Sequence, residues 1–594
     1  MSRPKAKDAV SSHALLNAAA PSAAKPMVDI GQAGGKDTLR ALEAAVRELK
    51  AMSVVPILRQ AIAALNREDF VEGGRLAIQA LDGDERNGVG WYLLGIARER
   101  AGDFPHSVMA YEAALKLLPN HAEVANDLGR LAYRMGMHEQ AEKLFRQFIA
   151  HAPEKAEGVN NLASVLKDSG RRGDAIQLLQ DSIPLHPNAA MLWNTLGALM
   201  LDIGDLENAL VFLTEAARLD PGFAKTRHNL GQAKMALGDP AGALADSDIA
   251  MTFKTTADDK ANMEFARSNY LLALGRIGEG WDQYEIRLSP RFPGATQFVI
   301  EAPQWSPGAD FGGKDFVIVA EQGLGDEILF ANLLPDVVAE MRPEGSLRIA
   351  IERRLVTLFQ RSFPEAQVIR HATYAAGTNP ARVIPDLDDE TVGMWAPMGS
   401  LLRQYRREVS DFPDRVGYLK ADPERVAYWK GLLEDLPGKK VGILWKSNIS
   451  KDHRSRFFSP FDLWEPVLKA PGVTIVNLQY GDCAAELALA QEKFGVEIWS
   501  PPGIDLKEDL DDLAALCCAM DLVIGFSNAT LNIAAACGVP TWLITTRTAW
   551  TRLGTDAYPW YPQVRVFSPE VFAWDVTMGE VADALAEFAA TPER

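Results

Sequence analysis

The sequence predicts a chain in two parts, an α-helical repeat array followed by an α/β region. Between residues 88 and 257 it repeats with a period of 34 residues, which is the spacing from Gly102 to Gly136 and from Gly136 to Gly170. From residue 315 onward this period stops, and short apolar runs alternate with helical stretches. A fixed period indicates stacked helical units, whereas strand–helix alternation indicates parallel sheets covered by helices.

The repeat is supported by several series of residues that keep one phase. These series are Gly102, Gly136, Gly170, Gly204 and Gly238; Pro119, Pro153, Pro187 and Pro221; Leu94, Leu128, Leu162, Leu196 and Leu230; and Ser107, Ala141, Ala175, Ala209 and Ala243. In each unit a glycine supplies the turn, a proline ends the second helix and a small residue allows close helix packing. We expect five regular units over 88–257, a degenerate unit over 54–87 and an aberrant one near 258–290.

The unit 88–121 resembles the tetratricopeptide (TPR) repeat. Trp91, Leu94 and Gly95 match its W-x2-L-G pattern, Gly102 its turn and Pro119 its end. Most TPR arrays bind a protein or a peptide. The resemblance therefore implies a protein-binding TPR array over 51–290, preceded by a tail over 1–50 that is partly disordered or helical.

Asparagines also recur in the first helix of successive repeats. Asn126, Asn160 and Asn194 share one phase, and Asn161 and Asn229 occupy the next. An amide side chain accepts and donates hydrogen bonds, so a row of them can hold an extended peptide backbone. O-GlcNAc transferase, which the array resembles, has a comparable ladder whose phase matches Asn161 and Asn229 better. We predict that these residues contact an acceptor protein; alternatively, they are polar positions on exposed helix faces.

Composition narrows the range of partners and compartments. The chain carries 79 acidic and 61 basic residues, a net charge of −18, which disfavours binding to nucleic acid through bulk charge. Its four cysteines form no CxxC or zinc-ligand spacing. The sequence contains no apolar run of about 18 residues, and its N-terminus lacks the apolar core of a secretory signal. We expect a cytoplasmic protein without an integral membrane segment.

The second half begins after a linker rich in proline and glycine over 291–312. Predicted strands lie at 316–320, 346–352, 441–445, 474–479, 496–500, 522–527 and 541–545, with predicted helices at 326–340, 424–435, 509–520 and 529–537. This alternation predicts two Rossmann-like halves, 313–423 and 424–594. In such sheets, ligands bind where strands end and helices begin.

The first of three notable strand ends is EQGLGDEILF at 321–330. Gly323 and Gly325 allow a ligand to approach the backbone, and Asp326 falls near the start of a helix. Alternatively, this is a helix-capping aspartate with two turn glycines.

The second strand end, WKSNISKDHRSRFF at 445–458, concentrates cations in an acidic protein. Lys446, Lys451, Arg454 and Arg456 suit a phosphate or diphosphate ligand, although a solvated charge run gives the same pattern. The third is GFSNATLNIAAACGVP at 525–540, where Ser527, Asn528 and Thr530 either grip a phosphate or ribose or simply cap the helix. The aspartate-rich run at 386–390 is interpreted as a solvated loop, so no metal site is predicted.

Taken together in this order, these elements resemble the TPR-fused bacterial glycosyltransferases. The residues that carry the resemblance are EQGLGDEILF (321–330), GILWKSN (442–448) with R-S-R (454–456), DLVIGFSN (521–528), PWYPQVRVF (559–567) and GRIGEGWDQYEIRL (275–288). The α/β part resembles the heptosyltransferase relatives of the GT-B fold, and the chain is most similar to the FlmG-type flagellin glycosyltransferases. The resemblance spans roughly 54–594 and implies a GT-B module with 313–423 on the acceptor side and 424–594 on the donor side.

The resemblance also implies residue roles. Asp326 corresponds to the family's candidate base, and Trp445 and Lys446 to donor-phosphate contacts. The sequence departs from the family where Ser527 and Asn528 replace aspartate-threonine and where Asn532 replaces histidine. The implied donor-binding residues are Gly323, Gly325, Trp445, Lys446, Ser447, Asn448, Lys451, Arg454, Arg456, Gln479, Tyr480, Ser527, Asn528 and Thr530.

The implied function is a metal-independent protein O-glycosyltransferase. It would move a nonulosonic, sialic-acid-like sugar from a CMP donor to Ser or Thr of an acceptor protein, flagellin, without a further cofactor. Three alternatives stay open: a non-catalytic TPR scaffold or chaperone with a degenerate transferase half, an O-GlcNAc-type transferase that uses a UDP-sugar, and a transferase directed at glycans or lipids.

Overall fold

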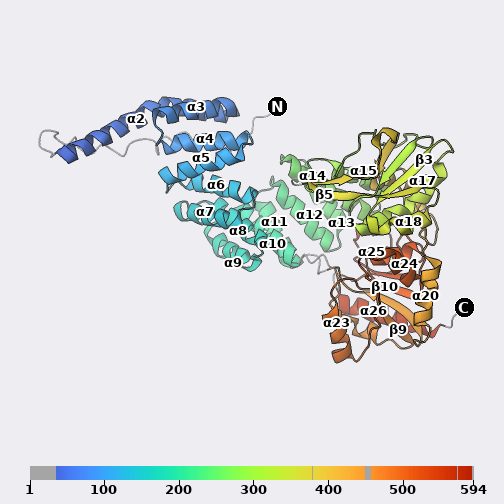
Figure 1. Cartoon of the computed structure of the whole chain (residues 1–594). Coiled ribbons are helices and arrows are strands. Elements are labelled where there is room, and N and C mark those ends of the chain that lie inside the picture. Colours follow the sequence, from blue (N-terminus) through green and yellow to red (C-terminus); the bar gives the residue numbers. More distant parts are fainter. Residues whose placement is uncertain (1–34, 377–378, 448–456, 571–572, 592–594) are drawn as a thin grey trace. The chain divides into compact units, whose positions relative to one another are not determined.

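The computed structural model describes residues 35–376, 379–447, 457–570 and 573–591. The chain forms two compact units, Met1–Leu199 and Met200–Arg594. The described part of the first unit is helical, and the second combines helical hairpins with parallel sheets (Figure 1). Among the described helices, none is long and apolar enough to cross a membrane.

The first unit is a succession of helices paired as hairpins. They are α2 (Gly35–Asn66), α3 (Phe70–Gly83), α4 (Gly88–Arg100), α5 (Phe104–Leu117), α6 (Ala122–Arg134), α7 (His138–His151), α8 (Ala156–Asp168), α9 (Arg172–Ser182) and α10 (Ala190–Ile203), the last of which runs into the second unit. Of the predicted tail 1–50, residues 35–50 form the beginning of α2, and residues 1–34 lie outside the described part.

The 34-residue period has a structural cause at the turns and at the helix contacts. Gly102, Gly136 and Gly170 have φ angles of 81°, 75° and 78°, a left-handed conformation that glycine adopts without strain. Ala141 and Ala175, in the small-residue series, are fully buried. The predicted hairpins between residues 88 and 257 are therefore confirmed at the level of their helices and turns.

The second unit begins with further hairpins of the same kind. Its helices up to residue 284 are α11 (Leu206–Leu219), α12 (Ala224–Ala236), α13 (Pro240–Met251), α14 (Ala257–Ala273) and α15 (Ile277–Tyr284). The pair α14 and α15, here called the last hairpin, departs from the period, because its turn glycine, Gly275, follows Gly238 by 37 residues.

Two parallel sheets follow in the second unit. The first has the strand order β4-β3-β2-β7, and the second has the order β12-β11-β10-β8-β9. Their strands are β2 (Asp315–Val319), β3 (Ser346–Ile351), β4 (Gln367–Arg370) and β7 (Met394–Pro397), and then β8 (Lys439–Leu444), β9 (Val473–Asn477), β10 (Leu522–Phe526), β11 (Thr541–Ile544) and β12 (Val564–Phe567). A smaller sheet pairs β1 (Gln297–Phe298), inside the predicted linker, with β6 (Asn379–Val383), which in turn pairs with β5 (Ala372–Ala376).

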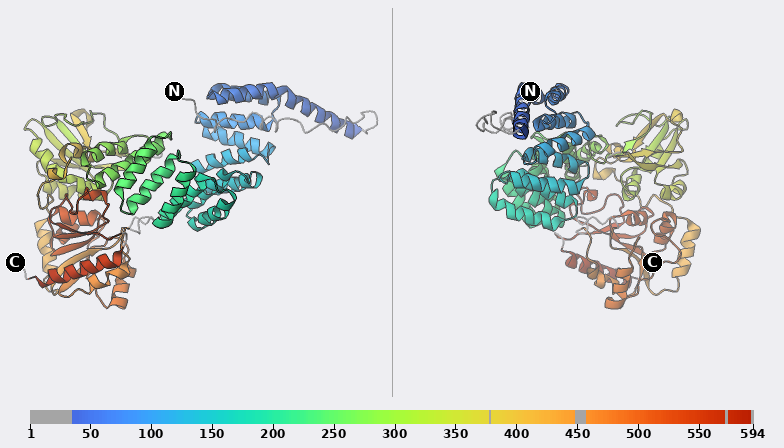
Figure 2. Two further views of the ribbon diagram at one scale, coloured as in Figure 1. Left: turned by 180° about the vertical axis from the view of Figure 1, so that it is seen from behind. Right: turned by 60° about the vertical axis from the view of Figure 1, so that its left-hand side comes forward.

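Helices flank both sheets (Figure 2). Near the first sheet these are α16 (Leu324–Phe330), α17 (Leu334–Glu340) and α18 (Val356–Ser362), and near the second α20 (Pro423–Leu433), α24 (Leu510–Cys518), α25 (Ala529–Ala536) and α26 (Trp574–Ala590). α26 packs Trp574, Met578 and Val581 into the core of the second sheet.

The predicted strand at 496–500 is wrong, because its pairing is limited to a single bridge from Trp499 to Val476. In the other direction, β4, β7 and β12 were not expected from the sequence. Each is only four residues long. In β4 and β12, the polar residues Gln367 and Arg565 also interrupt the apolar pattern that reveals longer strands.

An apolar core joins the last hairpin to both sheets. Trp281 of α15 is fully buried, and its indole Nε1 donates to the carbonyl oxygen of Arg406 at 2.8 Å. Its ring centroid lies 6.0 Å from that of Trp550 and 6.4 Å from that of Phe330. Because these rings come from segments far apart in the sequence, the last hairpin is part of the α/β core.

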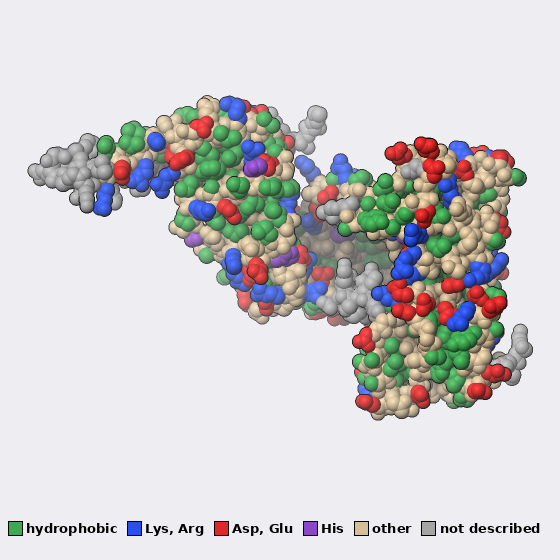
Figure 3. Space-filling model, viewed as in Figure 1, with side chains coloured by type: hydrophobic (Ala, Val, Ile, Leu, Met, Phe, Trp, Pro, Cys, Tyr) green, Lys and Arg blue, Asp and Glu red, His purple; other side chains and the backbone are tan. Residues whose placement is uncertain are grey.

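Ion pairs join segments that flank the two sheets. Arg361 of α18 pairs with Asp511 of α24 at 2.7 Å, and Arg353 pairs with Glu508 at 2.5 Å. Figure 3 shows acidic and basic side chains gathered in the region of these helices. The pair of Arg353 with Glu508 is exposed and contributes little free energy, whereas the pair of Arg361 with Asp511 is partly buried and joins the two side chains by two hydrogen bonds.

Candidate functional site

The loop after β2 and the first turn of α16 carry three acidic residues, and two of them are buried. Glu321 is buried against Arg287, with 2.5 Å between Oε1 and the guanidinium, and it also accepts from the backbone N–H of Gly399 at 2.9 Å. Burial opposes the charge of Arg287, yet Glu321 and Glu285 hold the pKa of this guanidinium above its usual range. Glu321 is therefore a structural counter-ion and is not placed to move protons.

Glu327 is the second enclosed acid. Its Oε1 lies 2.9 Å from Nε2 of His371, and its Oε2 accepts from the backbone N–H of Glu352 at 3.0 Å. Both Glu327 and His371 are buried, so this carboxylate ties α16 to the ends of β3 and β4.

Asp326 differs from both, because its side chain is half-buried. It occupies the first turn of α16, where its Oδ2 accepts from the backbone N–H of Gly323 at 3.3 Å. Its charge reaches Tyr558: burial raises the pKa of this tyrosine to about 12, the hydroxyls of Thr551 and Ser527 oppose the rise, and Asp326 adds to it. Asp326 thus lies close to residues that follow strands of the second sheet.

The loops that follow β2 and β10 meet at the contact between α16 and α25. Asn532 of α25 donates from Nδ2 to the carbonyl oxygen of Gly325 at 3.1 Å. A Cβ added to Gly325 would lie 3.5 Å from the backbone nitrogen of Ala529, an ordinary van der Waals distance, so the two helices pack in contact at this point. The carboxyl ends of the two sheets therefore come together here, where open α/β sheets bind ligands.

Two buried polar atoms at this junction have no hydrogen-bond partner among the described residues. Asn528 caps α25 by accepting from the N–H of Leu531 at 3.0 Å, which leaves its Nδ2 unsatisfied. Asn532 likewise leaves its Oδ1 unsatisfied. A buried amide atom without a partner costs free energy, so these atoms point to a ligand or water at the junction.

Three of the predicted donor-binding residues lie just after the ends of two neighbouring strands: Trp445 and Lys446 follow β8, and Gln479 follows β9. Nζ of Lys446 pairs with the carboxylate of Glu486. Trp445 is buried against Phe461, with ring centroids 5.0 Å apart. Gln479 is buried, and its Oε1 accepts from the backbone N–H groups of Trp445 and Lys446 at 3.0 and 2.9 Å, so it positions this loop.

The remaining predicted donor-binding residues fall into two groups. Asn448, Lys451, Arg454 and Arg456 lie outside the described residues. Of the others, Ser527 and Gly323 are exposed, Ser447, Tyr480, Gly325 and Asn528 are half-buried, and Thr530 is buried. Their contacts with a donor stay predictions.

A pocket of about 490 Å³ lies beside the junction, within the second unit. Its lining comes from α12, from α14, from Phe457 and Phe458, and from the segments at the carboxyl ends of β10 and β11. Neither its helical wall nor the segment 545–550 was predicted as part of a site. The sequence signal for the wall is weak, because Asn269 and Tyr270 resemble ordinary residues of a repeat helix.

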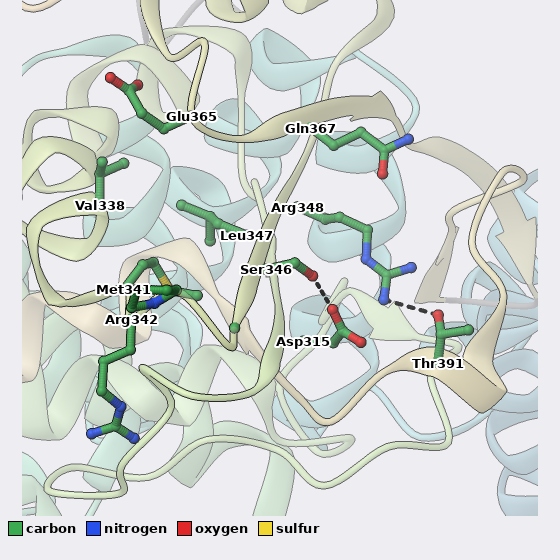
Figure 4. Close-up of a pocket in the computed structure, with 12 residues that line it drawn as sticks. Asp315, Val338, Met341, Arg342, Ser346, Leu347, Arg348, Glu365, Gln367 and Thr391 are labelled. Atoms are coloured by element: carbon green, nitrogen blue, oxygen red, sulfur yellow. Dashed lines mark hydrogen bonds between the residues drawn. The ribbon is translucent and has the colours of Figure 1, made fainter.

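A larger hollow of about 720 Å³ lies at the opposite edge of the first sheet (Figure 4). Asp315 and Ser346, at the amino ends of β2 and β3, bond to each other there, and Arg348 donates to Thr391 at 2.9 Å. Because ligands of parallel sheets bind at the carboxyl ends of strands, this hollow is not the candidate site.

Three of the predicted acceptor-binding asparagines, Asn126, Asn160 and Asn161, form hydrogen bonds between repeats. Asn126 is buried; it donates to Glu157 at 2.8 Å and accepts from Asn161 at 3.0 Å. Asn160 accepts from Thr195 at 2.6 Å. Asn194 is buried, whereas Asn160, Asn161 and Asn229 are half-buried. The amide of Asn126 already serves the stacking of repeats, and contact of any of these residues with a peptide stays a prediction.

Among the described residues, no group of three or more His, Cys, Asp or Glu side chains is arranged to hold a metal ion. Within the aspartate-rich run, Asp386 pairs with Arg370 at 3.4 Å, and Asp388 accepts from the N–H of Glu390 at 3.2 Å. These are surface contacts of a loop.

The helical hairpins and parallel sheets define a TPR protein with a C-terminal α/β part. The model of the tetratricopeptide repeat matches residues 92–156, 126–188 and 160–224, which confirms the TPR prediction. The chain belongs to the family of Protein FlbA from Caulobacter vibrioides (strain ATCC 19089 / CIP 103742 / CB 15), with which it shares 48% identity over 565 residues, or 95% of each chain.

Solved structures also match parts of the chain. MamA is 24% identical and covers 27% of this chain and 93% of its own, with a TM-score of 0.24. A tetratricopeptide repeat protein from Parabacteroides merdae ATCC 43184 is 16% identical and covers 39% of this chain and 93% of its own, with a TM-score of 0.34.

Proposed function

We propose that this chain is a protein O-glycosyltransferase with a GT-B module, which moves a sugar from a nucleotide donor to Ser or Thr of a protein that the TPR array recruits. The donor class is a CMP-linked nonulosonic sugar, and the acceptor is flagellin, as the sequence resemblance implies. The observation that carries the proposal is the junction of α16 and α25. There, the half-buried Asp326 and the unsatisfied amide atoms of Asn528 and Asn532 gather at the carboxyl ends of both sheets.

In this proposal Asp326 acts as the general base. The acceptor oxygen attacks the anomeric carbon, the bond from that carbon to the phosphate oxygen of the nucleotide breaks, and the acceptor proton passes to the carboxylate. The enclosure of Glu321 and Glu327 supports this assignment, because neither buried carboxylate is accessible to an acceptor hydroxyl.

The departing nucleotide carries negative charge that must be stabilised. The first turn of α25 offers backbone N–H groups and the positive end of a helix dipole, and Lys446 supplies a cation. Lys446 would exchange its ion pair with Glu486 for the phosphate. Lys451, Arg454 and Arg456 are further candidates, although they lie outside the described residues.

A second function is favoured by one set of contacts. The ion pair of Lys446 with Glu486 and the bond of Asn532 to Gly325 already occupy groups that a donor would use. A non-catalytic TPR scaffold with a degenerate transferase half would show the same contacts. A UDP-linked donor, as in O-GlcNAc-type transfer, is the alternative within the catalytic class.

The experiment incubates the full chain and purified flagellin with CMP-linked and UDP-linked sugars, one at a time, and records the intact mass of flagellin. We expect a mass increase equal to one or more sugar residues with a CMP-nonulosonate. A mass increase with UDP-N-acetylglucosamine instead would show that the donor is a UDP-sugar, while the proposed transfer reaction would stand. Tight capture of flagellin without any mass increase or nucleotide release would favour the scaffold.

A further inference from the structure

The pocket beside the junction is built in part by the repeat array. α12 contributes Met235 and Ala236, α14 contributes Ala266, Asn269 and Tyr270, and the opposite wall follows β10 and β11. The walls are bonded to each other, since Oγ1 of Thr548 donates to the carbonyl oxygen of Met235 at 3.1 Å. The turn of the last hairpin also packs tightly, because a Cβ added to Gly554 would lie 2.5 Å from the backbone nitrogen of Gly275. This wall is therefore a fixed part of the pocket.

The lining combines neutral polar groups with aromatic rings. Among the described side chains around the pocket, none carries a formal charge at neutral pH. Polar groups come from the amide of Asn269 and the hydroxyls of Ser527, Thr545 and Thr546, and aromatic surface comes from Trp550. Such a pocket suits a neutral ring with hydroxyl or amide substituents, because it orients the ring by a few hydrogen bonds and covers its apolar face.

Asn269 is a polar group of this wall that is available to a ligand. It is half-buried, and within the described part of the chain its amide makes no hydrogen bond. An amide that lines a pocket and has both a donor and an acceptor to offer matches a sugar hydroxyl or an acetamido group.

We infer that this pocket holds the uncharged, hydroxyl- and amide-bearing part of the donor sugar, and that Asn269 of the repeat array determines which sugar is accepted. The inference rests on the proposed glycosyl transfer and adds a role for the last hairpin beyond recruitment. A phosphate is the poorer occupant, because it would call for the cations or backbone N–H groups of the junction.

The test compares a nucleotide sugar with its bare nucleotide. Calorimetric titration of the full chain with CMP-N-acetylneuraminate and CMP, and with UDP-N-acetylglucosamine and UDP, gives the affinity gained from each sugar. Asn269→Ala removes the amide, Thr546→Val removes a hydroxyl at nearly constant shape, and Asn262→Ala is the control on α14 away from the pocket.

We expect Asn269→Ala and Thr546→Val each to weaken binding of the accepted nucleotide sugar by about 3- to 10-fold, as loss of one hydrogen bond predicts. Binding of the bare nucleotide and the behaviour of Asn262→Ala should not change. The inference is overturned if wild type and both pocket variants bind the nucleotide sugar equally. It is also overturned if both variants bind the bare nucleotide more weakly by the same factor. In either case the proposed function stands. If wild type binds none of these probes and modifies no flagellin, the proposed function fails, and this inference fails with it.

Discussion

The regular hairpins of the array and the last hairpin share one construction but differ in what surrounds their turns. Gly102, Gly136 and Gly170 have no atom within 4 Å of the position where a Cβ would stand, so their turns are open. Gly275, in the last hairpin, packs against Leu553 and Gly554 instead. Its partner helix α15 places Trp281 in the α/β core. The turns of these regular repeats thus leave a surface free for partners, whereas the last hairpin is packed against the α/β region.

The largest effect is expected at the apolar centre of the last hairpin. Trp281→Ala should lower the free energy of unfolding of the Met200–Arg594 unit by about 3–5 kcal/mol, because it leaves a cavity among buried rings. Trp91→Ala, at a half-buried tryptophan of a regular repeat, is the matched control and should cost less. Thermal unfolding of both variants measures the decrease in stability. Equal decreases would mean that Trp281 contributes no more to stability than a tryptophan of a regular repeat.

The turn glycines give a second contrast. Gly554→Ala should destabilise the chain more than Gly170→Ala, although both glycines have positive φ angles, 73° and 78°. In Gly170→Ala the cost is the left-handed backbone alone, about 1–2 kcal/mol. In Gly554→Ala a clash with the backbone of Gly275 is added. Denaturant midpoints measure both costs, and a larger loss in Gly170→Ala would break the contrast between open and covered turns.

The asparagines of the array test its role in recruitment. Replacing Asn126, Asn160 and Asn194 together by Ala should weaken capture of flagellin by about 1.5–4.5 kcal/mol, at roughly 0.5–1.5 kcal/mol for one hydrogen bond lost per residue. Donor affinity should not change. Because Asn126 also bonds between repeats, thermal unfolding serves as the control. Undiminished capture by a folded triple variant would exclude these asparagines as the docking site.

The stability of the array should also depend on pH. Burial raises the pKa of Asp127 to about 6, although Arg130 and the hydroxyl of Tyr92 oppose the rise. The folded state therefore holds this proton more tightly than the unfolded chain, so the stability it contributes is present below pH 4 and is lost as pH rises through 6. Asp127→Asn should remove this pH-dependent decrease in the free energy of unfolding, which is on the order of 1 kcal/mol for each unit by which the pKa is raised. Urea unfolding at pH 4 and pH 7 should give the variant a smaller decrease than wild type.

The sequence predicted the array well, because a period of 34 residues with glycine turns determines hairpins locally. It predicted strands less evenly. The apolar run at 522–527 is long enough to be recognised, whereas β12 depends on pairing with β11 and has no strong pattern of its own. At 496–500 the sequence predicted a strand, but the segment forms only one bridge, from Trp499 to Val476.

For the candidate site, the sequence predicted the loops but not the distribution of roles within them. Nothing local distinguishes Glu321, Asp326 and Glu327. Their difference arises from Arg287 and His371, which are distant in sequence and enclose the two glutamates. The wall that contains Asn269 could not be predicted for the same reason, since the fold alone brings α14 beside β11.

The proposed reaction depends most on Asp326 as the general base whose carboxylate takes the acceptor proton. The direct test is steady-state transfer to flagellin by wild type and Asp326→Asn at saturating donor, with donor and acceptor affinities measured alongside. Asn keeps the size of the side chain but cannot take the proton, so kcat should fall by at least about 100-fold while both affinities stay within a factor of two or so. A folded Asp326→Asn variant that transfers sugar at the wild-type rate would contradict the account.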